Sequence, residues 1–247
     1  MSVKKILVSQ ATPAGQPQYT ELCKKFGVEI DFHPFYVIEP LSSREFRSQH
    51  INLPDYTAIV FSARHAIDAF FAICEDLRVK VPDTMKYFCT TEAVAVYLQK
   101  HIVFRKRKIF YGTGTPQSVV ALVTAKHKGE KFLIATSDSG HNEAITKLFD
   151  EAHLDYTVGV FVKAVSQDLK AIDINGYDAM VMCNPADIKS IQENFPGLDL
   201  SKFQIITFGR QIVKSLDDAG VNIALQAPTP QAPSVAKALE LFLSSQK

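Results

Sequence analysis

The 247-residue sequence contains no tryptophan, and it has only four cysteines, Cys23, Cys74, Cys89 and Cys183. No two of them form a Cys-x-x-Cys pair, and none has a histidine at metal-ligand spacing, which argues against a zinc site and against a disulfide framework. We therefore expect four free thiols, as is usual in a reducing cytosol.

Long hydrophobic runs are also missing. The apolar run at residues 6–8 follows Lys4 and Lys5 but is too short for a signal peptide, and no later run is long enough to cross a bilayer. We predict a cytoplasmic protein without membrane contact.

An excess of one charge is absent as well, since 27 Lys and Arg stand against 26 Asp and Glu. Nucleic-acid binders usually carry a clear basic excess, so no nucleic-acid partner is expected, and the chain is predicted to be a monomer. The one basic run, Arg105 to Lys108, fits a solvated edge beside a strand at residues 109–111 better than a localisation signal or nucleic-acid patch.

Four motifs of catalysis and cofactor binding are not in the sequence. There is no Gly-x-Gly-x-x-Gly fingerprint, no Walker lysine loop, no Gly-x-Ser-x-Gly elbow and no His-x-x-x-His pair. The segment from Gly112 to Thr115 has no following Gly-Lys pair and is interpreted as a turn. Neither a cofactor nor a metal is predicted.

What the sequence does have is a series of short apolar runs, each followed by an amphipathic stretch. This alternation is typical of parallel sheets with helices on both faces. The runs lie at residues 6–8, 58–61, 87–89, 132–135, 179–183 and 205–208.

Two longer segments, residues 28–41 and 156–169, interrupt the alternation. Both are rich in Val, Ile, Phe and Tyr and lie roughly symmetrically about the middle of the chain, so we expect them to pair as a two-stranded antiparallel linker. The predicted fold is therefore α/β with two domains, each a parallel sheet flanked by helices. One domain comprises residues 1–36 and 170–247, and residues 37–169, including the linker strands, form an inserted domain.

One strand-to-helix unit occurs twice. The segment that begins at Tyr56 is echoed at Tyr177, with Tyr, Ala, Val and Ile in register at an offset of 177 − 56 = 121 positions. The segments around Ser118 and Ser234, near the end of each half of the chain, are also similar, and both serines are expected to be helix caps. The chain is predicted to contain an internal duplication.

Polar residues dominate the expected carboxyl ends of the strands, where open α/β sheets bind ligands. Helix capping alone explains most Ser, Thr, Asn and Asp residues at such positions. The functional interpretation rests on how many polar residues lie at these strand ends. It predicts an anionic ligand that many neutral donors hold in a cleft between the domains. The residues are Thr12, Ser62, Arg64, His65, Thr90, Thr91, Ser137, Asp138, Ser139, Asn184, Gly209, Arg210 and Gln211.

Four segments carry a resemblance to a known family: Ile-Val-Phe-Ser-Ala-Arg-His-Ala-Ile-Asp-Ala-Phe-Phe (59–71), Lys-Tyr-Phe-Cys-Thr-Thr-Glu-Ala-Val-Ala (86–95), Asn-Pro-Ala-Asp-Ile-Lys-Ser-Ile (184–191) and Thr-Phe-Gly-Arg-Gln (207–211). In their order and spacing they resemble uroporphyrinogen-III synthase over nearly the whole chain. Residues 86–108 look like the Bacteroidetes branch of that family.

The resemblance implies a cofactor-free enzyme that closes linear hydroxymethylbilane to uroporphyrinogen III and inverts the last pyrrole. Loss of the terminal hydroxyl as water would give an azafulvene, and a spiro intermediate would follow. The substrate carries eight carboxylates, which agrees with the anionic ligand expected from the strand ends. The alternative is a catalytically impaired relative that binds an anionic ligand.

Several positions depart from the family pattern. Phe161 lies in the second linker segment, residues 156–169, near the position where the resemblance implies a Tyr that acts as proton donor. Phe161 is still predicted to contact the substrate. Ile212 and Glu92 replace expected threonines. Ser62, Tyr156, a bound water and the substrate's own carboxylates remain as alternative proton donors.

Overall fold

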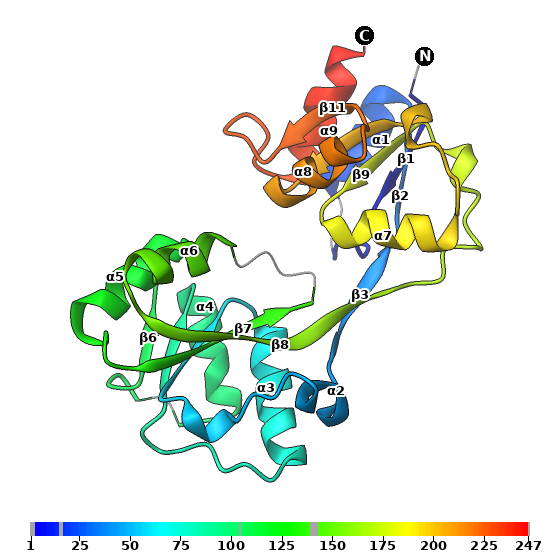
Figure 1. Ribbon diagram of the computed structural model, residues 1–247. Helices are drawn as coiled ribbons and strands as arrows, with labels where there is room; N and C mark the ends of the chain where they lie inside the picture. The colour runs from blue at the N-terminus through cyan, green and yellow to red at the C-terminus, as the bar shows by residue number, and fades with distance from the viewer. Residues whose placement is uncertain (1–2, 15–16, 104, 139–142, 247) are drawn as a thin grey trace. The chain divides into compact units, whose positions relative to one another are not determined.

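The computed structural model describes residues 3–14, 17–103, 105–138 and 143–246 (Figure 1). The chain divides into two compact units, Met1–Val37 with Val165–Lys247 (unit 1) and Ile38–Ala164 (unit 2). None of the described helices is long and apolar enough to cross a membrane.

Unit 1 is built on a five-stranded sheet whose described strand pairs are all parallel. Helices α1 (Pro17–Phe26) and α9 (Val235–Ser245) cover one face, and α7 (Pro185–Asn194) and α8 (Arg210–Asp218) cover the other. Burial on both faces explains why the strands are continuous apolar runs. In spatial order they are β11 (Ile223–Ala227), β10 (Gln204–Phe208), β9 (Ala179–Met182), β1 (Lys5–Val8) and β2 (Glu29–Phe32).

Unit 2 contains a six-stranded sheet. Helices α2 (Ser43–Arg47), α3 (Arg64–Asp76) and α4 (Glu92–Tyr97) pack on one face, and α5 (Pro116–Lys126) and α6 (Glu143–Glu151) pack on the other. The spatial order is β3 (Tyr36–Pro40), β8 (Asp155–Ser166), β7 (Lys131–Ser137), β4 (Ala58–Phe61), β5 (Lys86–Cys89) and β6 (Ile109–Tyr111). Four short 3₁₀ turns complete the described elements: η1 (Leu53–Asp55), η2 (Leu98–Lys100), η3 (Ile174–Gly176) and η4 (Leu200–Lys202).

The linker strands β3 and β8 are hydrogen-bonded neighbours. The Leu41 N–H donates to the Phe161 carbonyl at 2.9 Å and the Gln167 N–H donates to the Phe35 carbonyl at 2.8 Å, so the two strands run antiparallel. The expectation of one long strand over residues 28–41 is wrong, because β2 pairs with β1 in unit 1 and ends before Pro34. Proline has no N–H to donate and restricts the residue before it, which separates β2 from β3.

The two sheets share one strand order, which supports the internal duplication. An offset of 121 residues separates β4 from β9 (179 − 58 = 121) and also α3 from α7, while an offset of 126 separates β1 from β7 (131 − 5 = 126) and α1 from α6. Replacing each strand by its counterpart converts the order β8-β7-β4-β5-β6 into β2-β1-β9-β10-β11. Positions in one sheet can therefore be compared directly with those in the other.

Candidate functional site

Each sheet has a point at which the strand order reverses, between β1 and β9 in unit 1 and between β7 and β4 in unit 2. Ligands of open α/β sheets bind outside the carboxyl ends of the strands at such points. The residues that follow β9 and β4 therefore lie where a ligand of each sheet is expected.

In unit 1 the reversal point holds a buried carboxylate, that of Asp187 in the first turn of α7. Its Oδ2 accepts three hydrogen bonds: from the Cys183 N–H at 2.7 Å, the Asn184 N–H at 2.9 Å and the Ser9 hydroxyl at 2.8 Å. Its Oδ1 has no partner among the described residues. This end of the sheet thus binds a carboxylate that the chain itself supplies.

Burial raises the pKa of Asp187 from 3.8 to about 6, although the bonds from Cys183, Ser9 and Asn184 lower it. Burial, and then the charge of Asp187, raise the pKa of the Cys183 thiol to about 11. The thiol therefore stays protonated near neutral pH, and it accepts a hydrogen bond from Gln10 Nε2 at 3.2 Å. A thiol in this state is not a nucleophile.

In unit 2 the counterpart of Asp187 is Ala66 (187 − 121 = 66), and the counterparts of Cys183 and Asn184 are Ser62 and Ala63. No described group accepts a hydrogen bond from the N–H of Ser62 or of Ala63. Ala63 is the N-cap of α3 but gives no side-chain hydrogen bond, and the first turn of α3 has no acidic residue. Unit 2 therefore keeps the donors of a carboxylate site and lacks the internal carboxylate.

The helices also differ in whether a side chain caps their N-terminus. Side chains cap α4 (Thr91), α5 (Thr115), α7 (Asn184) and α9 (Ser234), whereas α3 and α8 have no side-chain cap. The N-cap of α8 is Gly209, where a Cβ would lie 2.8 Å from the Cys183 carbonyl oxygen, so only glycine fits. Free amides and a partial positive charge make each uncapped end a place for an anion, and among the helices whose N-cap is described, each unit has one.

Other predicted residues of unit 2 surround the start of α3. Ser62, Arg64 and His65 are exposed, and the Arg64 guanidinium lies over the Tyr97 ring at 5.3 Å. The Thr90 hydroxyl donates to the Ser62 carbonyl at 3.4 Å, which links the ends of β4 and β5. Thr91 accepts from the Val94 N–H at 3.3 Å, so its hydroxyl serves the cap.

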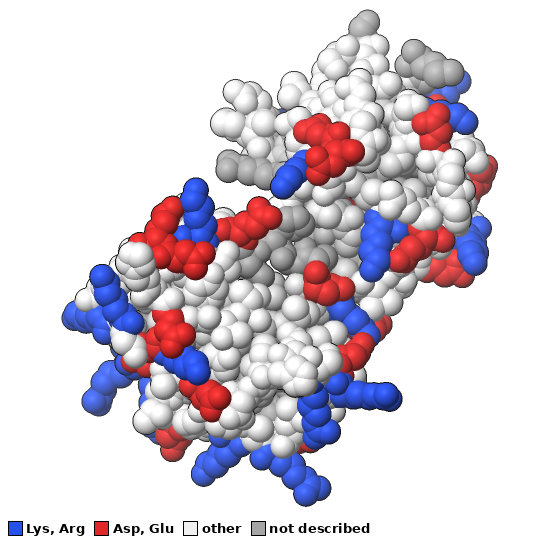
Figure 2. Space-filling model, viewed as in Figure 1, with Lys and Arg blue, Asp and Glu red and all other residues white. Residues whose placement is uncertain are grey.

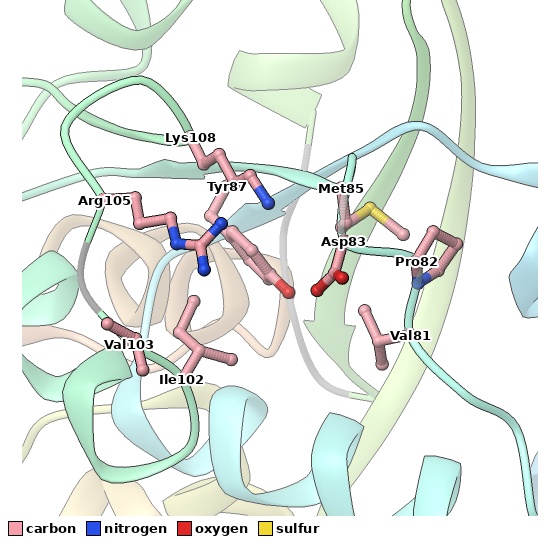
Figure 3. Close-up of a pocket in the computed structure, with 9 residues that line it drawn as sticks. All are labelled: Val81, Pro82, Asp83, Met85, Tyr87, Ile102, Val103, Arg105 and Lys108. Atoms are coloured by element: carbon pink, nitrogen blue, oxygen red, sulfur yellow. The ribbon is translucent and has the colours of Figure 1, made fainter.

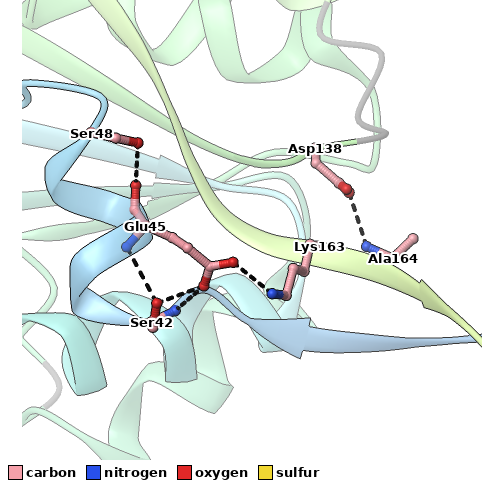
Figure 4. A network of polar contacts seen from close by, with 6 residues as sticks. All are labelled: Ser42, Glu45, Ser48, Asp138, Lys163 and Ala164. Carbon is pink, nitrogen blue, oxygen red and sulfur yellow. Dashed lines mark hydrogen bonds and ion pairs between the residues drawn. The ribbon is translucent and has the colours of Figure 1, made fainter.

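Ser137 is the last residue of β7, and Asp138 follows it at the same edge. The Asp138 carboxylate accepts from the Ala164 N–H at 2.9 Å, beside a network in which Glu45 accepts from Lys163 at 2.7 Å (Figure 4). Asp138 thus fixes the backbone of β8. Ser139 lies outside the described residues.

In unit 1 the remaining predicted residues lie at the corresponding edge. Thr12 lines a cavity of about 410 Å³ together with Asp31, His33 and Tyr177, whose hydroxyl donates to Asp31 at 2.8 Å. Gln211 is exposed in the first turn of α8, and the side chain of Arg210 lies outside the described part of the chain.

Two predicted residues are not brought to either edge. Phe161 is fully buried and packs on Phe46 and Phe70, with ring centroids 4.9 and 5.7 Å apart. Tyr156 is the second residue of β8, at the amino end of the sheet, and its hydroxyl donates to Asp150 at 2.9 Å. Neither side chain faces the groups around Ser62.

An exposed phenol that lies at the carboxyl edge of unit 2 is Tyr111, the last residue of β6. It is 42% exposed, and its hydroxyl donates to Glu92 Oε1 at 3.2 Å. This bond and the charge of Glu92 raise the pKa of Tyr111, which keeps the phenol protonated. Sequence reasoning missed Tyr111, Ser9 and Asp187; the one available signal was that Tyr111 ends a predicted strand.

Acidic and basic side chains are interspersed on the visible face of the molecule (Figure 2), in keeping with a net charge of +1. Among the described residues, no group of three His, Cys, Asp or Glu side chains is arranged to hold a metal ion. The donors available to a ligand at these edges are mainly amides and hydroxyls.

Fold and site together define an α/β protein of two like units, and among the helices whose N-cap is described, one in each unit has an N-terminus without a side-chain cap. The family model described as uroporphyrinogen-III synthase HemD matches residues 17–237. The chain therefore belongs to the uroporphyrinogen-III synthase family, lyases of tetrapyrrole biosynthesis.

Solved structures share the fold. Uroporphyrinogen III synthase of Thermus thermophilus, in a mutant form, is 12% identical with a TM-score of 0.57, and uroporphyrinogen-III synthetase of Helicobacter pylori is 14% identical with a TM-score of 0.58. Each alignment covers 98% of this chain and 99% of the other. A search of curated proteins finds no match.

Proposed function

We propose that this chain binds the carboxylates of hydroxymethylbilane at the open ends of α3 and α8 and closes the bilane to uroporphyrinogen III. It acts as a cytoplasmic monomer without a cofactor or a nucleic-acid partner. Units 1 and 2 are its two domains.

The observation that carries the proposal is the internal carboxylate of unit 1. Asp187 Oδ2 lies 2.7 and 2.9 Å from two backbone nitrogens, which are distances typical of charge-assisted hydrogen bonds. In unit 2 the equivalent donors belong to Ser62 and Ala63 and are left for a carboxylate from outside. Arg64 adds a cation beside them, and the Ser62 hydroxyl adds a further donor.

The reaction needs one proton donor and one proton acceptor. The donor protonates the terminal hydroxyl as the carbon–oxygen bond breaks, water leaves, and the pyrrole nitrogen supplies electrons to form the azafulvene. After ring closure, a carbon-bound proton is lost and restores the donor. We assign the donor role to the Tyr111 phenol, with Glu92 holding its orientation, because it is the exposed phenol at the edge that carries Ser62.

Positioning makes the larger contribution. The unrearranged ring forms spontaneously, so the enzyme must bring the substituted carbon of the last pyrrole nearest to the azafulvene. Carboxylates held at fixed helix ends restrict a flexible bilane in this way, and neutral donors do so without trapping the product by strong ion pairs.

The direct test is product analysis. Incubation of the purified chain with freshly made hydroxymethylbilane is expected to give the type III ring faster than the spontaneous reaction. Formation of the type I isomer alone, at the spontaneous rate, contradicts the proposal and favours the second candidate, a non-catalytic binder of a polycarboxylate. The burial of Phe161, where the family resemblance implies a phenol, is the observation that favours that candidate.

The binding site is tested by Ala66→Asp, which gives unit 2 the carboxylate that unit 1 has at Asp187. The new carboxylate should occupy the Ser62 and Ala63 N–H groups and raise KM at least about tenfold, since the loss of even one hydrogen bond to a charged group has an effect of this size. Ala66→Asn is the uncharged control of similar size and should raise KM less. An unchanged KM for Ala66→Asp would place the substrate elsewhere.

A further inference from the structure

A cavity of about 240 Å³ lies in unit 2 at the amino ends of β5 and β6 (Figure 3). Tyr87 is the second residue of β5 and Lys108 directly precedes β6, so this cavity lies at the opposite edge of the sheet from Ser62 and Tyr111. The proposed reaction does not use it. Its lining residues are Val81, Pro82, Asp83, Met85, Tyr87, Ile102, Val103, Arg105 and Lys108.

Tyr87 is the first sign that the cavity receives a ligand. The residue is only 4% exposed, yet its hydroxyl has no hydrogen-bond partner among the described residues. Figure 3 shows this hydroxyl pointing into the cavity, between Asp83 and Ile102. Burial raises the pKa of Tyr87, so the group is a neutral phenol that can donate one hydrogen bond and accept another. The hydroxyl is not one of the buried polar atoms without a partner, so water in the cavity can reach it, and a ligand there can replace that water and make the same hydrogen bonds.

The charges around the cavity are the second sign. Arg105 and Lys108 supply two cations and Asp83 supplies one anion, and none of the three is in an ion pair with another described residue. Arg105 and Lys108 also line an adjoining cavity of about 480 Å³. The sides of the first cavity that carry Val81, Met85 and Ile102 are apolar.

We propose that this cavity binds a small amino dicarboxylate, a molecule with one ammonium, two carboxylates and a short apolar body. The carboxylates pair with Arg105 and Lys108, the ammonium pairs with Asp83, and the apolar body lies on Ile102 and Met85. Each charge of the ligand then meets one opposite charge, and Tyr87 hydrogen-bonds a carboxylate oxygen. The volume admits a molecule of amino-acid size but not a linear tetrapyrrole.

The test is calorimetric titration of the full chain with L-glutamate, and with glutarate, which lacks the ammonium. Saturable binding of glutamate is expected below about 10 mM, and glutarate should bind at least about tenfold more weakly because Asp83 then faces the ligand without its partner. Arg105→Gln and Asp83→Asn should each weaken glutamate binding about tenfold, and Tyr87→Phe, which keeps the ring, about fivefold.

Arg107→Gln is the matched control, because it removes the same charge from the same basic run but lies outside this cavity. It should change the affinity less than about twofold, the effect of a general surface charge that salt screens. Three results would overturn the proposal: no saturable heat with glutamate, equal affinities for glutamate and glutarate, or equal losses for Arg105→Gln and Arg107→Gln.

Discussion

Replacing Asp187 by asparagine tests the central feature of the site, the internal carboxylate of unit 1. Asparagine has nearly the same shape, and its Oδ1 can take the place of Asp187 Oδ2 and accept from Cys183, Asn184 and Ser9. Its Nδ2 then occupies the position of Asp187 Oδ1, which has no described partner. The substitution therefore removes the charge and the titration while it keeps the three hydrogen bonds.

The magnitude follows from the pKa of Asp187, which burial raises from 3.8 to about 6. Because the folded state binds the proton more tightly than the unfolded state, Asp187 contributes stability below about pH 4, and this contribution is lost as the pH rises to about 6. A shift of about two pKa units corresponds to about 3 kcal/mol of unfolding free energy. The side chain is fully buried, so solvent does not screen this contribution.

The assay is urea unfolding of the wild type and of Asp187→Asn between pH 4 and pH 8, read by hydrogen exchange of peptides from β1 and β9, which report on unit 1. The unfolding free energy of Asp187→Asn minus that of the wild type should be about 2.5 kcal/mol larger at pH 7.5 than at pH 4, because part of the full contribution is already lost at pH 4. Asp217→Asn, which removes an exposed carboxylate of the same unit, is the matched control. A difference that does not change with pH would refute the claim that a buried, titrating carboxylate fills this position.

Three further predictions concern unit 2. Tyr111→Phe should lower kcat about a hundredfold with KM unchanged, as loss of a general acid does, whereas Tyr156→Phe should have no effect on turnover; equal kinetics for the two variants would remove Tyr111 from the mechanism. Arg64→Gln should raise KM about threefold to tenfold in steady-state assays, because a cation beside the carboxylate site is lost, and a KM equal to that of the wild type would contradict this. Phe161→Tyr should lower the urea unfolding free energy by about 1–3 kcal/mol without raising kcat, since the new hydroxyl would lie in an apolar core; a gain in turnover would show that a phenol there reaches the substrate.

The sequence was sufficient for most of the architecture. All six predicted apolar runs are strands, because a strand buried on both faces needs an unbroken run of apolar residues. The repeated tyrosines Tyr56 and Tyr177 each lie two positions before a strand, β4 and β9, and these are equivalent strands of the two sheets. β11 was missed, because its half-exposed sequence Ile-Ala-Leu-Gln-Ala at the sheet edge is less apolar than a central strand.

Local capping chemistry was only partly predictable. Ser234 caps α9 as expected, but α5 begins earlier than expected, and its cap is Thr115 instead of Ser118. Ser118 lies in the first turn, where its hydroxyl donates to the Thr115 carbonyl at 2.7 Å. The sequence Thr-Pro-Gln-Ser contains two candidate caps, and Pro116 decides between them, since proline suits the first turn of a helix.

The site residues were harder to predict, since their roles depend on partners that are distant in sequence. Asp187 was not predicted as a site residue, since one of its hydrogen-bond donors, Ser9, is 178 positions away in the sequence. Tyr111 and Glu92 are 19 positions apart and meet only because β5 and β6 pair in register. Ile212, in contrast, is a fully buried core residue, so the departure from threonine there alters packing and does not remove an exposed hydroxyl.

The comparison of the two units explains how one duplicated fold can acquire two different edges. After β4 and β9 the helices are equivalent, but α7 is capped by Asn184 and Asp187, whereas α3 is open. After β5 and β10 the relation is reversed, because Thr91 caps α4 and Gly209 leaves α8 open. If both copies had kept the same open helix, the two units would offer identical anion sites. Because the two copies differ in which of the helices with described N-caps is open, the open ends lie at non-equivalent positions of the two sheets. Under the proposed function, that asymmetry suits a substrate whose last ring must be distinguished from the other three.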